Sequence, residues 1–233
     1  MLFRSDHLWF ADDIFGLRSD WLANFADRLQ GAGVAVPFTM QSRCDLMNEQ
    51  AVDALARSGC FEVWLGAESG SQRVLDAMDK EITVEQIREA RHRLGERGIR
   101  SCFFIQFGYP GETWADIELT VAMVADLLPD DIGVSVSYPL PGTRFHEMVK
   151  LELDDQANWE HSGDLAMMFK GSYGTERARI NSSHMRLLAG RLEREKRSIV
   201  VSISQSRDNI GRDATWRPKV FAGGNAQIGR AHV

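Results

Sequence analysis

The sequence has few cysteines, no excess of positive charge and no long apolar run, and each absence narrows the range of functions. Its three cysteines, Cys44, Cys60 and Cys102, stand far apart, which favours reduced, buried thiols of a cytoplasmic protein over a disulfide framework. No two of them have the close spacing of a metal-binding pair. A net charge of -6 argues against binding of nucleic acid or of a membrane surface through bulk electrostatics.

The apolar runs are also too short for a membrane protein. The longest of them, such as Cys102 to Phe107, fall far below the roughly 20 residues of a spanning helix. No signal-peptide pattern precedes Asp6. With 233 residues, of which 44% are hydrophobic, the chain is long enough to bury the core of one α/β domain.

What the sequence does contain, as far as residue 138, is a regular alternation of apolar runs and helical segments. Three helical segments end with a leucine four residues before a glycine, at Gly33, Gly59 and Gly98, which predicts helices closed by a left-handed glycine. Thr83 and Thr113 each stand three residues before a capping partner and predict two further helix starts. Strands that alternate with such helices predict right-handed crossovers and a parallel sheet. The predicted strands are Leu8 to Ala11, Val36 to Gln41, Phe61 to Gly66, Ser101 to Phe107 and Gly133 to Tyr138.

Polar or glycine-containing residues follow each predicted strand, and on a parallel barrel such positions converge at one end. The stretch 108–112, Gly-Tyr-Pro-Gly-Glu, is typical of a ligand loop. Its glycines let the backbone approach a ligand, its proline stiffens the turn and its acid supplies a hydrogen-bond acceptor. The other four loops contribute Asp12 and Asp13, Arg43 and Asp45, Gly66, Glu68 and Ser69, and Pro139 to Thr143.

In chain order, these stretches resemble the radical S-adenosylmethionine (SAM) superfamily, most closely the class whose members often carry a cobalamin-binding domain ahead of the radical domain. The resemblance covers about residues 5–150 and implies an α/β fold, namely a partial parallel (β/α) barrel. The motifs are Trp-Phe-Ala-Asp-Asp-Ile-Phe (9–15), Ser-Arg-Cys-Asp-Leu (42–46), Gly-Ala-Glu-Ser-Gly-Ser (66–71), Gly-Tyr-Pro-Gly-Glu-Thr (108–113) and Pro-Leu-Pro-Gly-Thr (139–143).

In that superfamily, the loop after the first barrel strand carries three cysteines, spaced Cys-x3-Cys-x2-Cys, on a [4Fe-4S] cluster whose open iron binds SAM. This sequence has no such motif, and its strand at Leu8 to Ala11 resembles the family's second strand. The resemblance therefore implies an N-terminally truncated fragment that lacks the first βα unit and every metal ligand, and that is inactive as given.

For the intact protein, the resemblance implies formation of a 5′-deoxyadenosyl radical or cobalamin-dependent methyl transfer. The implied cofactors are SAM, the [4Fe-4S] cluster and cobalamin. The implied partners are a small-molecule or peptide substrate and an electron donor. No residue of the sequence identifies the substrate.

The resemblance assigns four residues to the methionyl end of SAM. Asp12 and Asp13 correspond to the contact with its amine, and Arg43 and Lys80 are candidate partners of its carboxylate. Each assignment has a structural alternative. Asp12 and Asp13 are also turn formers, and Arg43 is as well placed for a salt bridge with Asp45.

Six further residues are assigned to other contacts with SAM. Glu68 and Ser69 correspond to contacts with the ribose or the methionyl end, although they also suit an ordinary helix N-cap. Glu112 alternatively caps the helix predicted after Thr113. The residues that shape the adenine and ribose pocket are Gly108, Pro110, Gly111 and Glu112.

The alternation of strands and helices stops near residue 150, which predicts three regions. Residues 1–150 form the partial barrel, 151–197 a helical extension and 198–233 a tail. The last six residues, Ile228 to Val233, resemble the translation of a sequencing adapter.

Two other functions remain open at this point. One is a barrel hydrolase that uses Asp13 and Glu68 as acid and base and needs no cluster. The other is a non-catalytic module in which an incomplete barrel binds a partner at an exposed strand edge.

Overall fold

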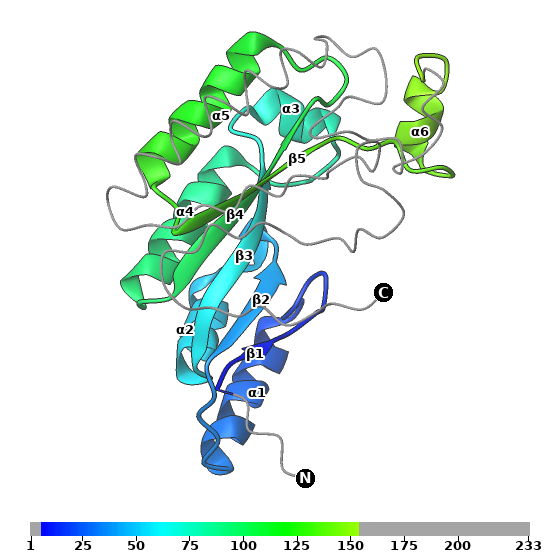
Figure 1. The fold of residues 1–233 in the computed structure, drawn as a ribbon. Helices are drawn as coiled ribbons and strands as arrows, with labels where there is room; N and C mark the ends of the chain where they lie inside the picture. Colours follow the sequence, from blue (N-terminus) through cyan, green and yellow to red (C-terminus); the bar gives the residue numbers. More distant parts are fainter. Residues whose placement is uncertain (1–5, 154–233) are drawn as a thin grey trace, which may run out of the picture.

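A computed structural model describes residues 6–153 of the chain. Its five strands are parallel and form one sheet in the order β1-β2-β3-β4-β5, which curls into a half-barrel (Figure 1). All five strands predicted from the sequence are confirmed, although the first is two residues shorter than expected. Their bounds are β1 (Leu8–Trp9), β2 (Phe38–Ser42), β3 (Cys60–Glu68), β4 (Arg100–Phe107) and β5 (Asp131–Val136).

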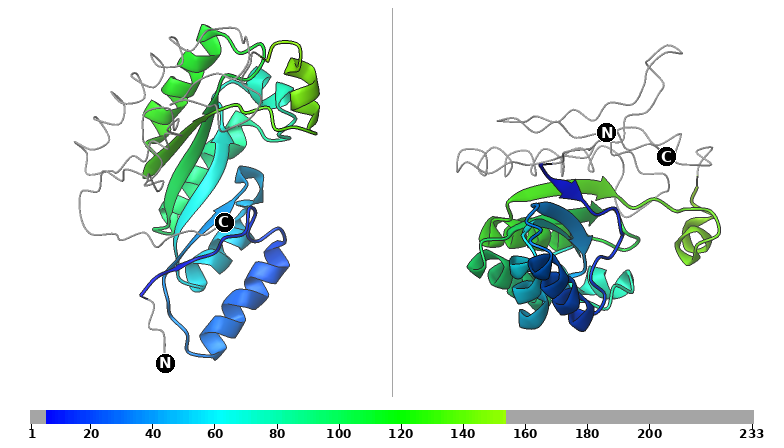
Figure 2. Two further views of the ribbon diagram at one scale, coloured as in Figure 1. Left: turned by 45° about the vertical axis from the view of Figure 1, so that its right-hand side comes forward. Right: turned by 90° about the horizontal axis from the view of Figure 1, so that it is seen from below.

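The helices between the strands cover one face of the sheet, and the last helix follows β5 and lies to one side (Figure 2). Two of them, α3 and α6, are short helices of six residues each that the sequence pattern did not predict. The predicted extension and tail, residues 151–197 and 198–233, lie almost wholly outside the described residues. The helices are α1 (Ser19–Gly31), α2 (Glu49–Arg57), α3 (Gln72–Ala77), α4 (Val84–Glu96), α5 (Trp114–Leu127) and α6 (Arg144–Val149), with a 3-10 turn η1 (Cys44–Leu46) after β2.

The predicted helix ends are confirmed. Gly33, Gly59 and Gly98 follow α1, α2 and α4 with φ of 65°, 84° and 70°, a conformation that costs a glycine little. At the start of α4, the Thr83 hydroxyl accepts from the Gln86 amide at 3.1 Å while the Gln86 side chain accepts from the Thr83 amide at 2.8 Å. These local signals fix where each crossover begins and ends.

The core lies between the sheet and its helices. Phe38, Phe103 and Ile105 from the strands are fully buried, as are Leu55 and Ile87 from the helices. Such burial stabilises the sheet-on-helix layer by about 1.5–3 kcal/mol for each large side chain. No helix among the described residues is long and apolar enough to cross a membrane.

One irregularity in the sheet bears on the site. The register between β3 and β4 shifts between Gly66 and Glu68, and Glu68 has a φ of 59°. A non-glycine residue in the left-handed conformation is strained, and a bulge at the end of a strand changes the direction of the side chain. The bulge therefore sets the direction of the Glu68 carboxylate.

Candidate functional site

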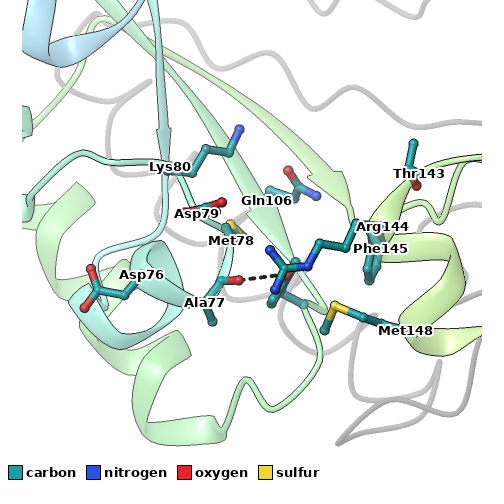
Figure 3. A pocket seen from close by; sticks show the side chains of 11 residues that line it. Asp76, Ala77, Met78, Asp79, Lys80, Gln106, Thr143, Arg144, Phe145 and Met148 are labelled. Carbon is teal, nitrogen blue, oxygen red and sulfur yellow. Dashed lines mark hydrogen bonds between the residues drawn. The ribbon is translucent and has the colours of Figure 1, made fainter.

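The loops that follow the five parallel strands share one edge of the sheet, because parallel strands all end on the same side. A cavity of about 610 Å³ opens at this edge between the ends of α3, β4 and the start of α6 (Figure 3). Its lining mixes both signs of charge with an aromatic surface, since Lys80 and Arg144 line it together with Asp76 and Asp79. The Tyr109 and Phe145 rings stack at 5.3 Å.

Lys80 and Glu68 form an ion pair at this edge. The Lys80 Nζ donates to the Glu68 Oε1 at 2.9 Å, and the Glu68 side chain is only 13% exposed. Lys80 lies in the turn between α3 and α4, whereas Glu68 ends β3. Two residues that the sequence separates by twelve positions are therefore brought into contact.

Arg43, directly after β2, joins the same network. Its Nε donates to the Asp45 Oδ1 at 2.9 Å, which is the salt bridge that the sequence left open as an alternative. Its Nη2 donates to the backbone carbonyl of Lys80 at 3.0 Å. The loop after β2 is thus tied to the turn that carries Lys80.

The loop at 108–112 closes on itself. Glu112 is 1% exposed, and its Oε2 accepts from the Gly108 amide at 2.6 Å. Gly111 has a φ of 80°, and its carbonyl accepts from the Arg73 Nη2 at 2.8 Å. In this arrangement the Glu112 carboxylate shapes the loop, so its assigned contact with SAM stays a prediction, as do those of Gly108, Pro110 and Gly111.

Ser69 has a structural role in the described chain. Its hydroxyl lies 3.1 Å from the Thr120 hydroxyl on α5 and accepts from the Ser71 amide at 3.1 Å. The side chain is fully buried. Ser69 therefore anchors the loop after β3 to α5, and the structure leaves its predicted contact with SAM untested.

Asp12 and Asp13 stand apart from the other assigned residues. Both follow β1 and are exposed. Neither carboxylate forms a hydrogen bond or ion pair with another residue in the range 6–153. They share the sheet edge with Lys80 and Glu68 without contacting the network.

One residue of this edge, Asp116 on α5, was not assigned a role from the sequence. Its carboxylate accepts from the Ser71 hydroxyl at 2.6 Å and from the Thr113 amide at 2.8 Å, and it pairs with Arg73. Burial opposes ionisation of this group, but the bonds from Arg73, Ser71 and Thr113 outweigh it and hold the pKa of Asp116 well below its usual value. Only the capping spacing with Thr113 was visible in the sequence.

The three cysteines are free and buried, as predicted. Burial raises the pKa of the Cys44 and Cys60 thiols to about 12 and that of Cys102 well above its usual value. No three His, Cys, Asp or Glu side chains of residues 6–153 are grouped so that they could hold a metal ion. The described residues therefore do not fit a [4Fe-4S] cluster.

Residues 12–124 match the model of the Radical SAM superfamily, a range that begins just after β1, ends within α5 and includes the loops after β1, β2, β3 and β4. These residues belong to the radical SAM superfamily. This assignment agrees with the parallel half-barrel. It gives no support to the carboxylate hydrolase.

Individual relatives match over part of their length. An uncharacterized methyltransferase, PH0819, of Pyrococcus horikoshii is 30% identical over 138 residues, which are 59% of this chain and 30% of that protein. A putative methylthiotransferase, MJ0865, of Methanocaldococcus jannaschii is 30% identical over 107 residues, which are 46% of this chain and 24% of that protein. The chain thus spans less than a third of the length of either relative.

Solved structures share the fold at lower identity. The radical SAM methyltransferase TsrM of Kitasatospora setae, solved with cobalamin and a [4Fe-4S] cluster bound, superposes with a TM-score of 0.56 at 21% identity, over 63% of this chain and 31% of that one. Elp3 of Methanocaldococcus infernus gives a TM-score of 0.54 at 20% identity, over 62% of this chain and 40% of that one.

Proposed function

We propose that this chain is the SAM-binding part of a radical SAM enzyme of the class that also uses cobalamin. The observation that carries the proposal is the Lys80–Glu68 ion pair within the matched region, at the carboxyl ends of the strands. The pair places a cation and an anion side by side. A bound zwitterion can replace each of them as the partner of the other. The SAM carboxylate then pairs with Lys80 and its amine with Glu68.

The other assigned residues support this arrangement in different ways. Asp12 and Asp13 are exposed at the same edge and offer acceptors to the amine end. Glu112 and its glycines hold the loop that faces the nucleoside. Ser69 holds the loop that presents Glu68.

When bound, SAM supplies either a radical precursor or a methyl group, and the residues described above bind and orient it. The cluster that such chemistry needs finds no ligands among residues 6–153, so no step is assigned to it. For the whole protein, we infer a small-molecule or peptide substrate, an electron donor and, from the reduced, buried thiols, a cytoplasmic location.

The proposal is tested by titrating SAM into the purified chain by isothermal titration calorimetry. Lys80→Met and Glu68→Gln each remove one charge of the pair, and each should weaken binding about tenfold or more. Lys150→Met and Glu62→Gln are matched controls. Lys150 pairs with the exposed Glu147, and Glu62 pairs with Arg100 near the opposite end of β3.

Equal affinity of Lys80→Met and the unaltered chain would contradict the assignment of this site. Absence of any SAM binding by the unaltered chain would favour the non-catalytic binding module instead.

A further inference from the structure

The Arg43 guanidinium is engaged by protein groups on two sides. The Asp45 carboxylate accepts from its Nε at 2.9 Å and from its Nη2 at 3.3 Å. The Lys80 carbonyl accepts from the same Nη2 at 3.0 Å. The side chain is partly buried, with 31% of its surface exposed. Arg43 therefore binds the backbone carbonyl of Lys80, in the turn of residues 79–81 between α3 and α4, which we call the Lys80 turn.

That turn is strained on both sides of Lys80. Asp79 has a φ of 57° and Glu81 a φ of 53°, which disfavour any residue with a Cβ. Two backbone hydrogen bonds close the end of α3. The Asp79 amide donates to the Asp76 carbonyl, and the Lys80 amide donates to the Leu75 carbonyl. These bonds hold the amide side of Lys80, whereas Arg43 holds its carbonyl side.

The conformation of this turn decides where the Lys80 ammonium lies. The Lys80 Nζ lies 2.9 Å from the Glu68 carboxylate. Glu68 itself has a left-handed backbone conformation at the bulge of β3. A strained turn keeps its geometry only when its surroundings fix it. The Arg43 bond is a long-range contact that does so, because it joins residues 37 positions apart.

We propose that Arg43 is a positioning residue, which holds the Lys80 turn in the conformation that brings Lys80 to Glu68, and that it does not bind SAM itself. The inference rests on the proposed function insofar as Lys80 and Glu68 bind SAM. The alternative is that Arg43 leaves these partners and contacts the SAM carboxylate directly.

The first test needs no cofactor. Amide hydrogen exchange of the unliganded chain is followed by mass spectrometry in two variants, Arg43→Ala and Asp45→Asn. Asp45→Asn weakens the ion pair with Arg43 but keeps the guanidinium. The amides of residues 79–81 should exchange about tenfold faster or more in Arg43→Ala, and by a smaller factor in Asp45→Asn.

Arg57→Ala is the matched control, because it also removes an arginine paired with a single aspartate, the exposed Asp27. Its exchange at 79–81 should equal that of the unaltered chain. Unchanged protection of β3 and β4 shows that each variant is folded. Unchanged exchange of 79–81 in a folded Arg43→Ala would overturn the proposal.

The second test is a double-mutant cycle on SAM affinity with Arg43→Ala and Lys80→Met. If Arg43 acts through Lys80, Arg43→Ala weakens binding several-fold in the unaltered chain and adds little once Lys80 is gone. Losses that add fully would instead assign Arg43 a direct contact and would overturn the proposal. If the unaltered chain binds no SAM, the proposed function fails, and the exchange experiment still decides the role of Arg43.

Discussion

Asp116 is the residue that joins two loops of the candidate site. Its carboxylate takes hydrogen bonds from Ser71 after β3 and from Thr113 before α5, and it pairs with Arg73 on α3. The side chain is 7% exposed, so these bonds act with little screening by water. Because they favour the ionised form and hold its pKa below that of an unfolded aspartate, Asp116 stabilises the fold most when it is charged.

Asp116→Asn should therefore lower the free energy of unfolding at neutral pH by about 2–3 kcal/mol, measured by urea unfolding. The stability that Asp116 supplies is present above the pKa of the unfolded carboxyl, about 3.9, and is lost as the pH falls through it toward the lower folded value. Between about pH 5 and pH 3, the unaltered chain should lose stability more steeply than Asp116→Asn. Asp126→Asn, an exposed change on the same helix, serves as the control. Equal slopes for Asp116→Asn and the unaltered chain would contradict this account.

Among the elements, the contact of the β3–α3 loop with α5 depends on one glycine. A Cβ built on Gly70 would lie 2.5 Å from the Leu119 carbonyl oxygen and 2.7 Å from the Thr120 Cα. The Gly70 amide also donates to the Thr120 hydroxyl at 2.9 Å. Since the obstacles are backbone atoms, the loop can accept a side chain here only by moving away from α5.

Gly70→Ala should consequently destabilise the chain by about 1–3 kcal/mol in urea unfolding. It should also displace Ser69 and the Glu68 that precedes it, and so weaken SAM binding. Gly31→Ala is the matched control, because a Cβ there meets nothing within 4 Å and alanine favours the helix α1. A Gly70→Ala chain as stable as Gly31→Ala would show that the close approach is not required.

The same elements show which parts of the structure the sequence could predict. Strand positions and helix ends followed from local signals, such as the apolar run before Phe107 and the glycine at position 98. The helix α3 was missed because it has only six residues and is followed not by a glycine but by Asp79, which adopts the left-handed conformation two residues after the helix ends at Ala77. The bond from Arg43 to the Lys80 carbonyl was missed because backbone acceptors leave no trace in a residue pattern.

At the scale of the whole molecule, the described residues carry the loops that we propose bind SAM but no group of side chains that could hold the cluster. Cys44 follows β2, Cys60 begins β3 and Cys102 lies within β4, so the three sulfurs are distributed over the buried sheet. Iron is bound by thiolates. Because burial raises the pKa of the Cys44 and Cys60 thiols to about 12, both stay protonated at neutral pH.

The chain should accordingly hold no [4Fe-4S] cluster after anaerobic incubation with iron and sulfide, followed by desalting and iron analysis. SAM binding measured by calorimetry should be the same before and after that treatment, because Lys80 and Glu68 need no metal to form their ion pair. Cys102→Ala is the control, and its iron content should equal that of the unaltered chain. A stoichiometric cluster that is lost in Cys102→Ala would mean that the sheet opens to release its thiols, which the close packing of a buried core opposes.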